Sequence, residues 1–285
     1  MALSPGALPH DTIPGTAWTE ADWRIFEAKV RWGFQHGLGV ATPGDAIAAL
    51  GKTFVGTPYR PATLEVPGEE QLVINLRELD CVTFVENVLA LTRFIRNDGI
   101  RALANPPAAR EQYEGYLRQL RYRRGVINGY PSRLHYFSEW LAVNAANRRL
   151  RIITRDLGGE ADREPLGFMS SNPGAYRQMA DASVATAIRD MEQALNARPE
   201  RYFIPEGRIA AVAPGIKDGD LIAATSTLAG LDVAHTGFAL WQGNKLHLLH
   251  APLVGSAVEI SEVPLADRIQ SIKTQDGIMV ARPLP

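Results

Sequence analysis

Residues 233–250 read VAHTGFALWQGNKLHLLH, two apolar-rich runs joined by Gly243-Asn244. A Gly-Asn pair at this place suits a two-residue turn between antiparallel strands. The turn predicts that Gln242 pairs with Lys245 and that pairing continues outward along both runs. The sequence therefore predicts a β-hairpin, and with it an antiparallel sheet late in the chain.

The register of this hairpin brings two of its three histidines together. Side chains that face each other across a ladder, and alternate side chains along one strand, lie on the same side of a sheet. Gly237 lies opposite His250, so His235 and His250 share one face as diagonal neighbours. His247 pairs with Leu240 and points to the other face. The shared face also carries small or apolar residues that a helix could cover: Gly237, Ala239, Leu246 and Leu248.

Helical patterns precede strand patterns along the chain. Apolar residues first recur at helical spacing, and short β-like runs separated by turn residues follow. This order predicts an α+β fold. The predicted helices cover about 19–37, 42–50, 80–95, 113–120, 134–144 and 184–195. The predicted strands cover 221–224, 233–241, 245–250 and 279–281, with a further short strand at 71–76.

Length and composition indicate an ordinary globular protein. The 285 residues are 46% hydrophobic and 21% charged, and the formal net charge of −1 offers no electrostatic footprint for nucleic acid. We expect a loose leader at 1–17 and a single catalytic domain at 18–285 with a helical insert at about 100–200. No stretch approaches the roughly 20 apolar residues of a membrane span. Residues 1–20 lack the pattern of a secretory signal, so the chain is expected to stay in the cell or to be a mature form.

Cys81 is the single cysteine, and it stands in the first turn of the helix predicted from about Asp80. The partial positive charge of a helix start lowers the pKa of a thiol and favours the thiolate. The alternative is a small buried core residue, since free cysteines are usually buried. If this helix covers the hairpin face, the thiol meets His235 and His250. Nucleophile, base and orienting group would then form a catalytic triad.

A metal site is the other chemistry that three nearby histidines allow. His247 faces away from the other two, and no Cys, Asp or Glu has a convincing zinc-ligand spacing. Two half-buried histidines with purely structural hydrogen bonds are the remaining alternative. We therefore predict no metal and no organic cofactor.

Four segments in order resemble a known superfamily: GTPY at 56–59, DCVTFVE at 80–86, HTGFA at 235–239 and LHA at 249–251. They look like the G-x-P-Y segment, Asp-Cys helix start, H-x-G strand and third polar residue of the NlpC/P60 papain-like cysteine hydrolases. Each segment alone is weakly specific, and the resemblance rests on their order. It implies a papain-like fold, with the nucleophile helix packed on the antiparallel sheet.

The chain is similar in more detail to one branch, the N-acetylmuramoyl-L-alanine amidase-like family. That branch resembles this chain in D-C-x-T-F-V-E, where most of the superfamily has Asp-Cys-Ser-Gly. The resemblance spans about 46–283. Ala234 and Thr236 depart from it, because a hydroxyl residue and a valine commonly flank the histidine. Further matching segments are SRLHY at 132–136 with Trp140, FMS at 168–170, DGD at 218–220 and GLD at 230–232.

The resemblance implies roles for five residues. Cys81 would attack the amide carbonyl, His235 would act as base, and His250 would orient His235. The Tyr59 hydroxyl and the Cys81 backbone N–H would stabilise the oxyanion. Asp80 would contact substrate or brace the site. Without the resemblance, Tyr59 is a turn aromatic and Asp80 a helix cap.

The branch is thought to cut between the muramic acid lactyl group and L-alanine, especially in anhydromuropeptides. Muropeptides are the expected partners, which points to the periplasm or cell envelope. A sugar-bearing substrate needs aromatic faces and polar groups, and these could come from Arg133, Tyr136, Trp140, Ser170 and Tyr176. For Tyr136 and Trp140, four residues apart on a predicted helix, ordinary packing is the alternative.

Two other functions fit the same residues. A related peptidase would cut the γ-D-glutamyl–diaminopimelate bond of the stem peptide. A wall-binding module with an inactive site would bind the same fragments without chemistry.

Overall fold

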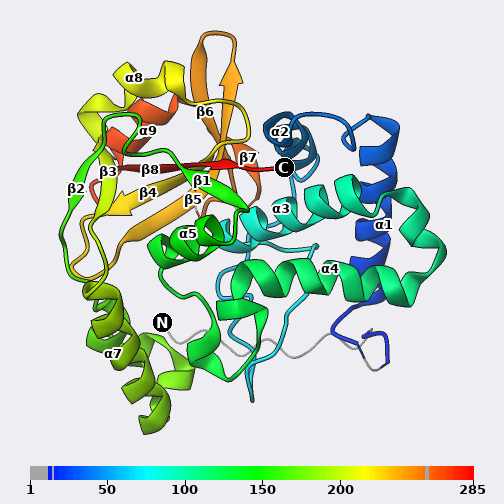
Figure 1. Cartoon of the computed structure of the whole chain (residues 1–285), viewed down its shortest axis with the longest axis horizontal. Helices are drawn as coiled ribbons and strands as arrows, with labels where there is room; N and C mark the ends of the chain where they lie inside the picture. Colours follow the sequence, from blue (N-terminus) through cyan, green and yellow to red (C-terminus); the bar gives the residue numbers. More distant parts are fainter. Residues whose placement is uncertain (1–11, 15, 254–256) are drawn as a thin grey trace.

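The computed structural model describes residues 12–14, 16–253 and 257–285. It contains an eight-stranded sheet with helices on both faces, and every strand pairing is antiparallel (Figure 1). Seven strands follow the order β2-β3-β8-β4-β5-β6-β7, and β1 also pairs with β8. The predicted combination of helices with an antiparallel sheet is confirmed. The strands are β1 Leu150–Ile152, β2 Glu160–Asp162, β3 Arg201–Pro205, β4 Leu221–Ser226, β5 Val233–Gln242, β6 Lys245–His250, β7 Glu259–Ile260 and β8 Gln275–Pro283.

The helices fall mostly in the first two thirds of the chain, as predicted. Proline and glycine-rich loops and several short 3-10 turns join them. No helix in the described ranges is long and apolar enough to cross a membrane. The α-helices are α1 Glu20–Gln35, α2 Pro43–Lys52, α3 Cys81–Asn97, α4 Pro106–Arg121, α5 Phe137–Ala146, α6 Phe168–Ser171, α7 Ala182–Asn196, α8 Ile209–Val212 and α9 Leu265–Ser271.

The hairpin β5–β6 has the predicted register. Gln242 pairs with Lys245 across the turn, and Gly237 pairs with His250 at the far end. Gly243 has a φ of +61°, a left-handed conformation that glycine adopts without the steric cost of a side chain. His235 and His250 therefore lie on one face of the sheet, and His247 lies on the other.

Helix α3 packs on the sheet, on the face opposite the one that carries His235 and His250. Phe84 of α3 meets Phe238 of β5 edge-on, with ring centroids 5.8 Å apart, on the side of the sheet that holds Leu240 and Leu249. The histidine face packs instead against α9, where Leu265 and Ile269 meet a separate apolar cluster: Ile222, Ala239, Leu246 and Leu248. Figure 1 shows α8 and α9 on one side of the sheet and α3 and α5 on the other. The condition under which a triad was expected, that this helix covers the histidine face, is therefore not met. Both faces of β5 are apolar, so its pattern does not say which face α3 covers.

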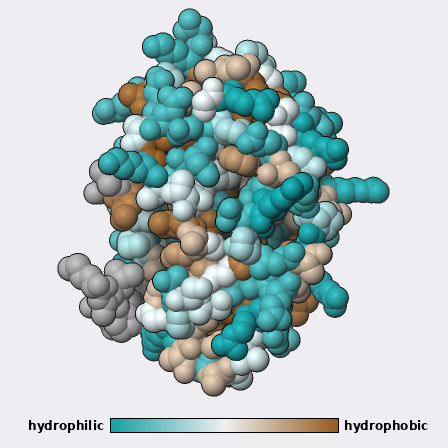
Figure 2. Space-filling view, turned by 90° about the vertical axis from the view of Figure 1, so that its left-hand side faces the viewer, coloured by the Kyte–Doolittle hydropathy of each residue, from teal (hydrophilic) through white to brown (hydrophobic). Residues whose placement is uncertain are grey.

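One further sequence prediction differs from the structure. Residues 71–76 form no strand, and this extended segment is held by side chains, with the Leu76 N–H donating to Asp22 Oδ1 at 2.8 Å. Most of the predicted leader 1–17 lies outside the described residues. Residues 100–200 hold mostly helices together with β1 and β2, and they contribute α7 at one side of the molecule (Figure 1). On that side hydrophobic side chains lie scattered among hydrophilic ones (Figure 2).

Candidate active site

Two imidazole rings form the centre of the candidate site. His235 Nε2 lies 2.8 Å from His250 Nδ1, and the rings meet edge-on at 85° with centroids 4.9 Å apart. His250 is fully buried, whereas His235 is partly exposed. The hydrogen bond to His250 leaves Nδ1 as the second ring nitrogen of His235.

The Cys81 sulfur lies at the edge of β5, next to the backbone of Thr236. Ala239 makes its backbone hydrogen bonds to Asp220 and Gly219, on the β4 side of the strand. Backbone groups alternate in direction along a strand, so the N–H of Thr236 points to the other side, just beyond the end of β6. There it donates a hydrogen bond to the Cys81 sulfur. The thiol thus contacts the residue that follows His235.

The thiol is held at the first position of α3 by a well-formed helix start. Asp80 caps α3, with its Oδ1 accepting from the Thr83 N–H at 2.7 Å while the Thr83 hydroxyl accepts from the Asp80 N–H at 2.9 Å. This reciprocal capping box fixes where Cys81 begins the helix. In the described structure, the His235 ring bonds to His250 and makes no hydrogen bond to the sulfur. The start of α3 is therefore adjacent to β5, but the Cys81 thiol and the His235 ring are not hydrogen-bonded to each other.

The site holds its titratable groups in their neutral forms. Burial, followed by the charge of Asp80, raises the pKa of the Cys81 thiol to about 12, although three backbone N–H groups act to lower it. The N–H groups of the helix start lower this pKa, as predicted, but desolvation of the thiolate outweighs them, so the expected thiolate is not favoured. Burial, and then the charge of Arg268, lowers the pKa of His235 to about 3. Burial, His235 and Arg268 lower that of His250 to about 2.

Tyr59 lies next to the thiol, as the sequence suggested. Its backbone forms an isolated bridge with Leu79, directly before the start of α3. Burial, followed by the charges of Cys81 and Asp80, raises the pKa of the Tyr59 hydroxyl to about 12. The hydroxyl therefore keeps its proton at neutral pH and can donate a hydrogen bond. Asp80 acts structurally as a helix cap, and its Oδ2 also accepts from the Thr63 hydroxyl at 3.2 Å.

Two charged residues that the sequence did not predict interact with the two histidines. Glu259 of β7 pairs with His250 in the sheet, and its Oε1 lies 3.7 Å from His250 Nε2. This buried Nε2 has no hydrogen-bond partner among the described residues. Arg268 of α9 acts electrostatically on both histidines and on Glu259. No motif signalled either residue, because a two-residue strand and a short helix leave little pattern.

Three of the predicted substrate contacts are buried in the fold. The Trp140 Nε1–H donates to Glu86 Oε1 at 3.1 Å, and the ring is 1% exposed. The Tyr136 hydroxyl donates to Glu192 Oε1 at 2.6 Å and accepts from the Met169 N–H. Arg133 is 4% exposed, donates to the Leu64 carbonyl at 3.1 Å and pairs with two acidic side chains. Burial of all three argues against the predicted contact with substrate.

The other two predicted contacts remain accessible. Ser170 is partly exposed, and its hydroxyl donates to the Gly167 carbonyl at 3.2 Å. Tyr176 is partly exposed and stays protonated, because burial and the charges of Glu65 and Glu192 raise the pKa of its hydroxyl to about 12. In residues 12–14, 16–253 and 257–285 no group of three His, Cys, Asp or Glu side chains is arranged to hold a metal ion.

Comparison with known proteins identifies the family. The AmiA-like model, described as N-acetylmuramoyl-L-alanine amidase-like, matches residues 49–278. The chain belongs to this family. A solved N-acetylmuramoyl-L-alanine amidase of Bacteroides uniformis is 35% identical over 85% of this chain and 99% of its own, with a TM-score of 0.78. No curated protein matches the chain.

Two further solved structures share the fold of this amidase-like chain. A Bacteroides fragilis protein described as a candidate xylanase is 34% identical over 81% of this chain and 98% of its own, with a TM-score of 0.74. A Legionella pneumophila protein is 21% identical over 93% and 96%, with a TM-score of 0.64, and supports the fold alone. Family and neighbours together support an amidase-like role on peptidoglycan.

Proposed function

We propose that this chain is a cysteine amidase that cuts the amide bond between N-acetylmuramic acid and L-alanine in peptidoglycan fragments, anhydromuropeptides in particular. The proposal includes a papain-like NlpC/P60 fold, one catalytic domain over 18–285 and action in the periplasm or cell envelope. One observation carries it: the Cys81 sulfur accepts a hydrogen bond from the N–H next to His235, whose ring bonds to His250.

The first half of the reaction makes a thioester. The neutral thiol of Cys81 attacks the lactyl carbonyl carbon while His235 Nδ1 takes the thiol proton. This step requires His235 Nδ1 to come within hydrogen-bond reach of the sulfur in the substrate complex, where catalytic hydrogen bonds are often shorter than in the free enzyme. The tetrahedral intermediate then collapses, the C–N bond breaks, and His235 gives its proton to the amine of L-alanine.

The second half of the reaction restores the enzyme. Water enters where the peptide amine left, and His235 Nδ1 removes one of its protons as the oxygen attacks the thioester carbon. The C–S bond breaks, Cys81 recovers the proton from His235, and the muramic acid leaves as its free carboxylic acid. The developing oxyanion in both halves would accept hydrogen bonds from the Tyr59 hydroxyl and the Cys81 backbone N–H.

Glu259 favours one direction of the hydrogen bond between His235 and His250. A neutral imidazole carries one N–H, so either His235 or His250 donates in their hydrogen bond. If His235 Nε2–H donates, its Nδ1 is free to accept a proton, and His250 Nε2–H points to the Glu259 carboxylate. The opposite arrangement would place a lone pair of His250 against that carboxylate. Glu259 therefore favours the form in which His235 is a base.

Digestion of purified muropeptides tests the proposal. The wild-type protein should release the intact stem peptide from the sugar, and Cys81→Ala should release nothing, with products identified by mass. A released dipeptide would instead establish the γ-D-glutamyl–diaminopimelate peptidase. Intact substrate that binds wild type and Cys81→Ala equally would establish the wall-binding module. A Cys81→Ser protein that still cuts the amide at the wild-type rate would end the role of Cys81 as nucleophile.

The similarity to a candidate xylanase does not favour glycoside hydrolysis here. Glycosidases generally need two carboxyl groups that flank the scissile bond. The reactive cluster described above consists of a thiol, a phenol and two imidazoles. Of the two nearby carboxylates, Asp80 caps α3 and Glu259 lies beside the buried Nε2 of His250, so each already has a partner in the fold. New reducing ends from xylan in the presence of the protein would contradict this argument.

A further inference from the structure

A second pocket lies at the opposite end of α3 from Cys81. It is a cavity of about 80 Å³ between α2, α3, α4 and the ends of β1, β4 and β8. Leu89 and Asn97, both in its wall, follow Cys81 by eight and sixteen residues, which is about 12 and 24 Å along a helix that rises 1.5 Å per residue. The pocket is therefore separate from the candidate active site.

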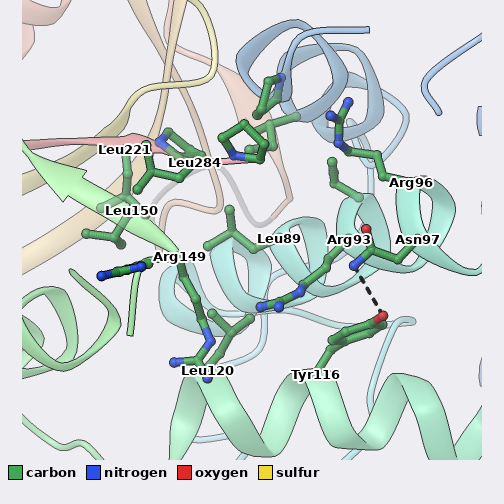
Figure 3. A pocket seen from close by; sticks show the side chains of 16 residues that line it. Leu89, Arg93, Arg96, Asn97, Tyr116, Leu120, Arg149, Leu150, Leu221 and Leu284 are labelled. Atoms are coloured by element: carbon green, nitrogen blue, oxygen red, sulfur yellow. Dashed lines mark hydrogen bonds between the residues drawn. The ribbon is translucent and has the colours of Figure 1, made fainter. Parts of the chain in front are cut away.

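Much of the wall is aliphatic. Leu89 of α3 and Leu120 of α4 lie between the two sides of the pocket in Figure 3, and Leu150 and Leu221 close the side toward the sheet. Such a surface favours a hydrocarbon group over a bare inorganic ion.

Positive charge is concentrated around this apolar floor. Arg93 and Arg149 enter the pocket from opposite sides (Figure 3). Arg93 lies over the Tyr116 ring, 5.2 Å from its centroid, and forms no ion pair with a described residue. Arg149 donates to two neutral amide oxygens, Gln119 Oε1 at 3.2 Å and Asn144 Oδ1 at 3.4 Å. Neither guanidinium has a carboxylate partner in the described chain.

Two buried polar atoms in the wall lack partners. Thr92 is 4% exposed, and its hydroxyl makes no hydrogen bond to a described residue. The Arg149 Nε–H is likewise buried without an acceptor. An unmade hydrogen bond at a buried polar group is costly, so both atoms are better satisfied by an acceptor in the cavity. The Arg93 charge also opposes the Arg149 charge, and an anion between them would remove that repulsion.

We propose that this pocket, named here the arginine pocket after Arg93 and Arg149, binds a carboxylate attached to a short aliphatic body. The carboxylate accepts from the guanidinium groups and the Thr92 hydroxyl, while the aliphatic part packs on Leu89 and Leu120. A volume of about 80 Å³ holds roughly five to eight water-sized groups, which suits an acid of that size. The ligand is either a free short acid or the carboxyl-terminal residue of a peptide.

Calorimetric titration at low salt tests this proposal with defined probes. Butyrate should bind saturably, and butyramide, which has the same shape without the charge, should bind at least about tenfold more weakly, the loss of one charge-assisted hydrogen bond. N-acetylalanine distinguishes the two sources: tighter binding than butyrate indicates a peptide terminus, and weaker binding a free acid. Equal binding of butyrate and butyramide, or no binding of either acid, overturns the proposal.

Variants assign the binding to the arginine pocket. Arg149→Gln, Arg93→Gln and the near-isosteric Thr92→Val should each weaken butyrate binding, by about tenfold for each arginine. Arg24→Gln removes the same charge from an exposed position of α1 outside the pocket and should leave binding unchanged. Unchanged affinity in both arginine variants, each checked for folding by circular dichroism, overturns the assignment. Because binding is measured directly, an inactive Cys81 would not affect the result.

Discussion

His235 Nε2 lies 2.8 Å from His250 Nδ1, and the other ring nitrogen of His250 lies 3.7 Å from Glu259 Oε1. Glu259, His250 and His235, which belong to three neighbouring strands, thus form a chain of contacts that ends at the second ring nitrogen of His235. A neutral imidazole carries one N–H, so the tautomer of His250 that Glu259 favours determines which nitrogen of His235 carries the hydrogen. The catalytic competence of His235 would then depend on a carboxylate two side chains away.

Replacing Glu259 tests this dependence. We expect Glu259→Leu to lower kcat by about 10- to 100-fold with little change in KM, because the variant loses the carboxylate that favours the base form of His235. Nitrogen-15 NMR should show His235 gaining the tautomer with hydrogen on Nδ1. Glu262→Gln, at an exposed position nearby, is the matched control. A Glu259→Leu protein with wild-type kcat and an unchanged His235 tautomer would contradict the proposed direction of the pair.

The activity should depend only weakly on pH near neutrality. With the His235 pKa lowered to about 3 and the Cys81 pKa raised to about 12, thiol and imidazole both stay neutral between them. The value of kcat/KM should therefore be nearly level from about pH 5 to 9, falling only when His235 is protonated or the thiol ionises. Muropeptide hydrolysis over this range measures it. A bell-shaped profile with limbs near neutrality would indicate an ionised thiolate–imidazolium pair instead.

The buried histidines should make the fold sensitive to mild acid. The pKa of His250 is 6.5 when exposed and about 2 in the fold, so the native state resists a proton that the unfolded chain accepts. Its contribution to stability is fully present above about pH 6.5 and is lost as the pH falls toward the folded value. The free energy of unfolding should drop by about 1.4 kcal/mol per pH unit from this histidine alone.

Urea unfolding between about pH 6.5 and 4.5 measures that slope, and His250→Asn is the comparison. Asparagine keeps a hydrogen-bonding side chain at the position and has no titrating group. Its slope should be smaller than that of the wild type, with the difference growing as the pH falls. Parallel curves for the two proteins would show that His250 titrates alike in the folded and unfolded states.

The sequence predicted the hairpin and its histidines better than their surroundings. A two-residue turn and alternating side chains determine which residues of β5 and β6 pair, so His235 and His250 could be matched without a structure. The face covered by α3 could not be predicted, because Phe238 on one side and Ala239 on the other are equally compatible with burial. Glu259 reaches His250 only through a sheet contact that no local pattern encodes.

The same limit explains the predicted substrate residues. Trp140 and Tyr136 lie on one stretch of chain, and helical spacing alone does not say whether an aromatic ring meets a ligand or the core. Each side chain is held in the core by a hydrogen bond to a residue far away in the sequence: Trp140 donates to Glu86, and Tyr136 donates to Glu192. These partners became visible only once the folded neighbourhood of each ring was known.

Glu86, in the DCVTFVE segment, should be essential for stability and not for the chemistry. Its Oε2 accepts from Arg121 Nε at 2.7 Å, both side chains are at most 2% exposed, and its Oε1 accepts from Trp140. Glu86→Gln leaves the Arg121 charge buried without its counter-ion, which should cost about 3–5 kcal/mol in the free energy of unfolding. Trp140→Phe removes one hydrogen bond and should cost less.

The double change Glu86→Leu with Arg121→Leu separates charge from packing. Removing both charges leaves no buried ion unpaired, so the double variant should be more stable than Glu86→Gln despite altering more atoms. Urea denaturation gives the three free energies, and kcat per folded molecule should stay near the wild-type value in each. A double variant less stable than the single one would mean that the Glu86–Arg121 pair contributes through geometry that leucine side chains cannot replace. Loss of kcat in fully folded Glu86→Gln would instead connect Glu86 to the reacting groups.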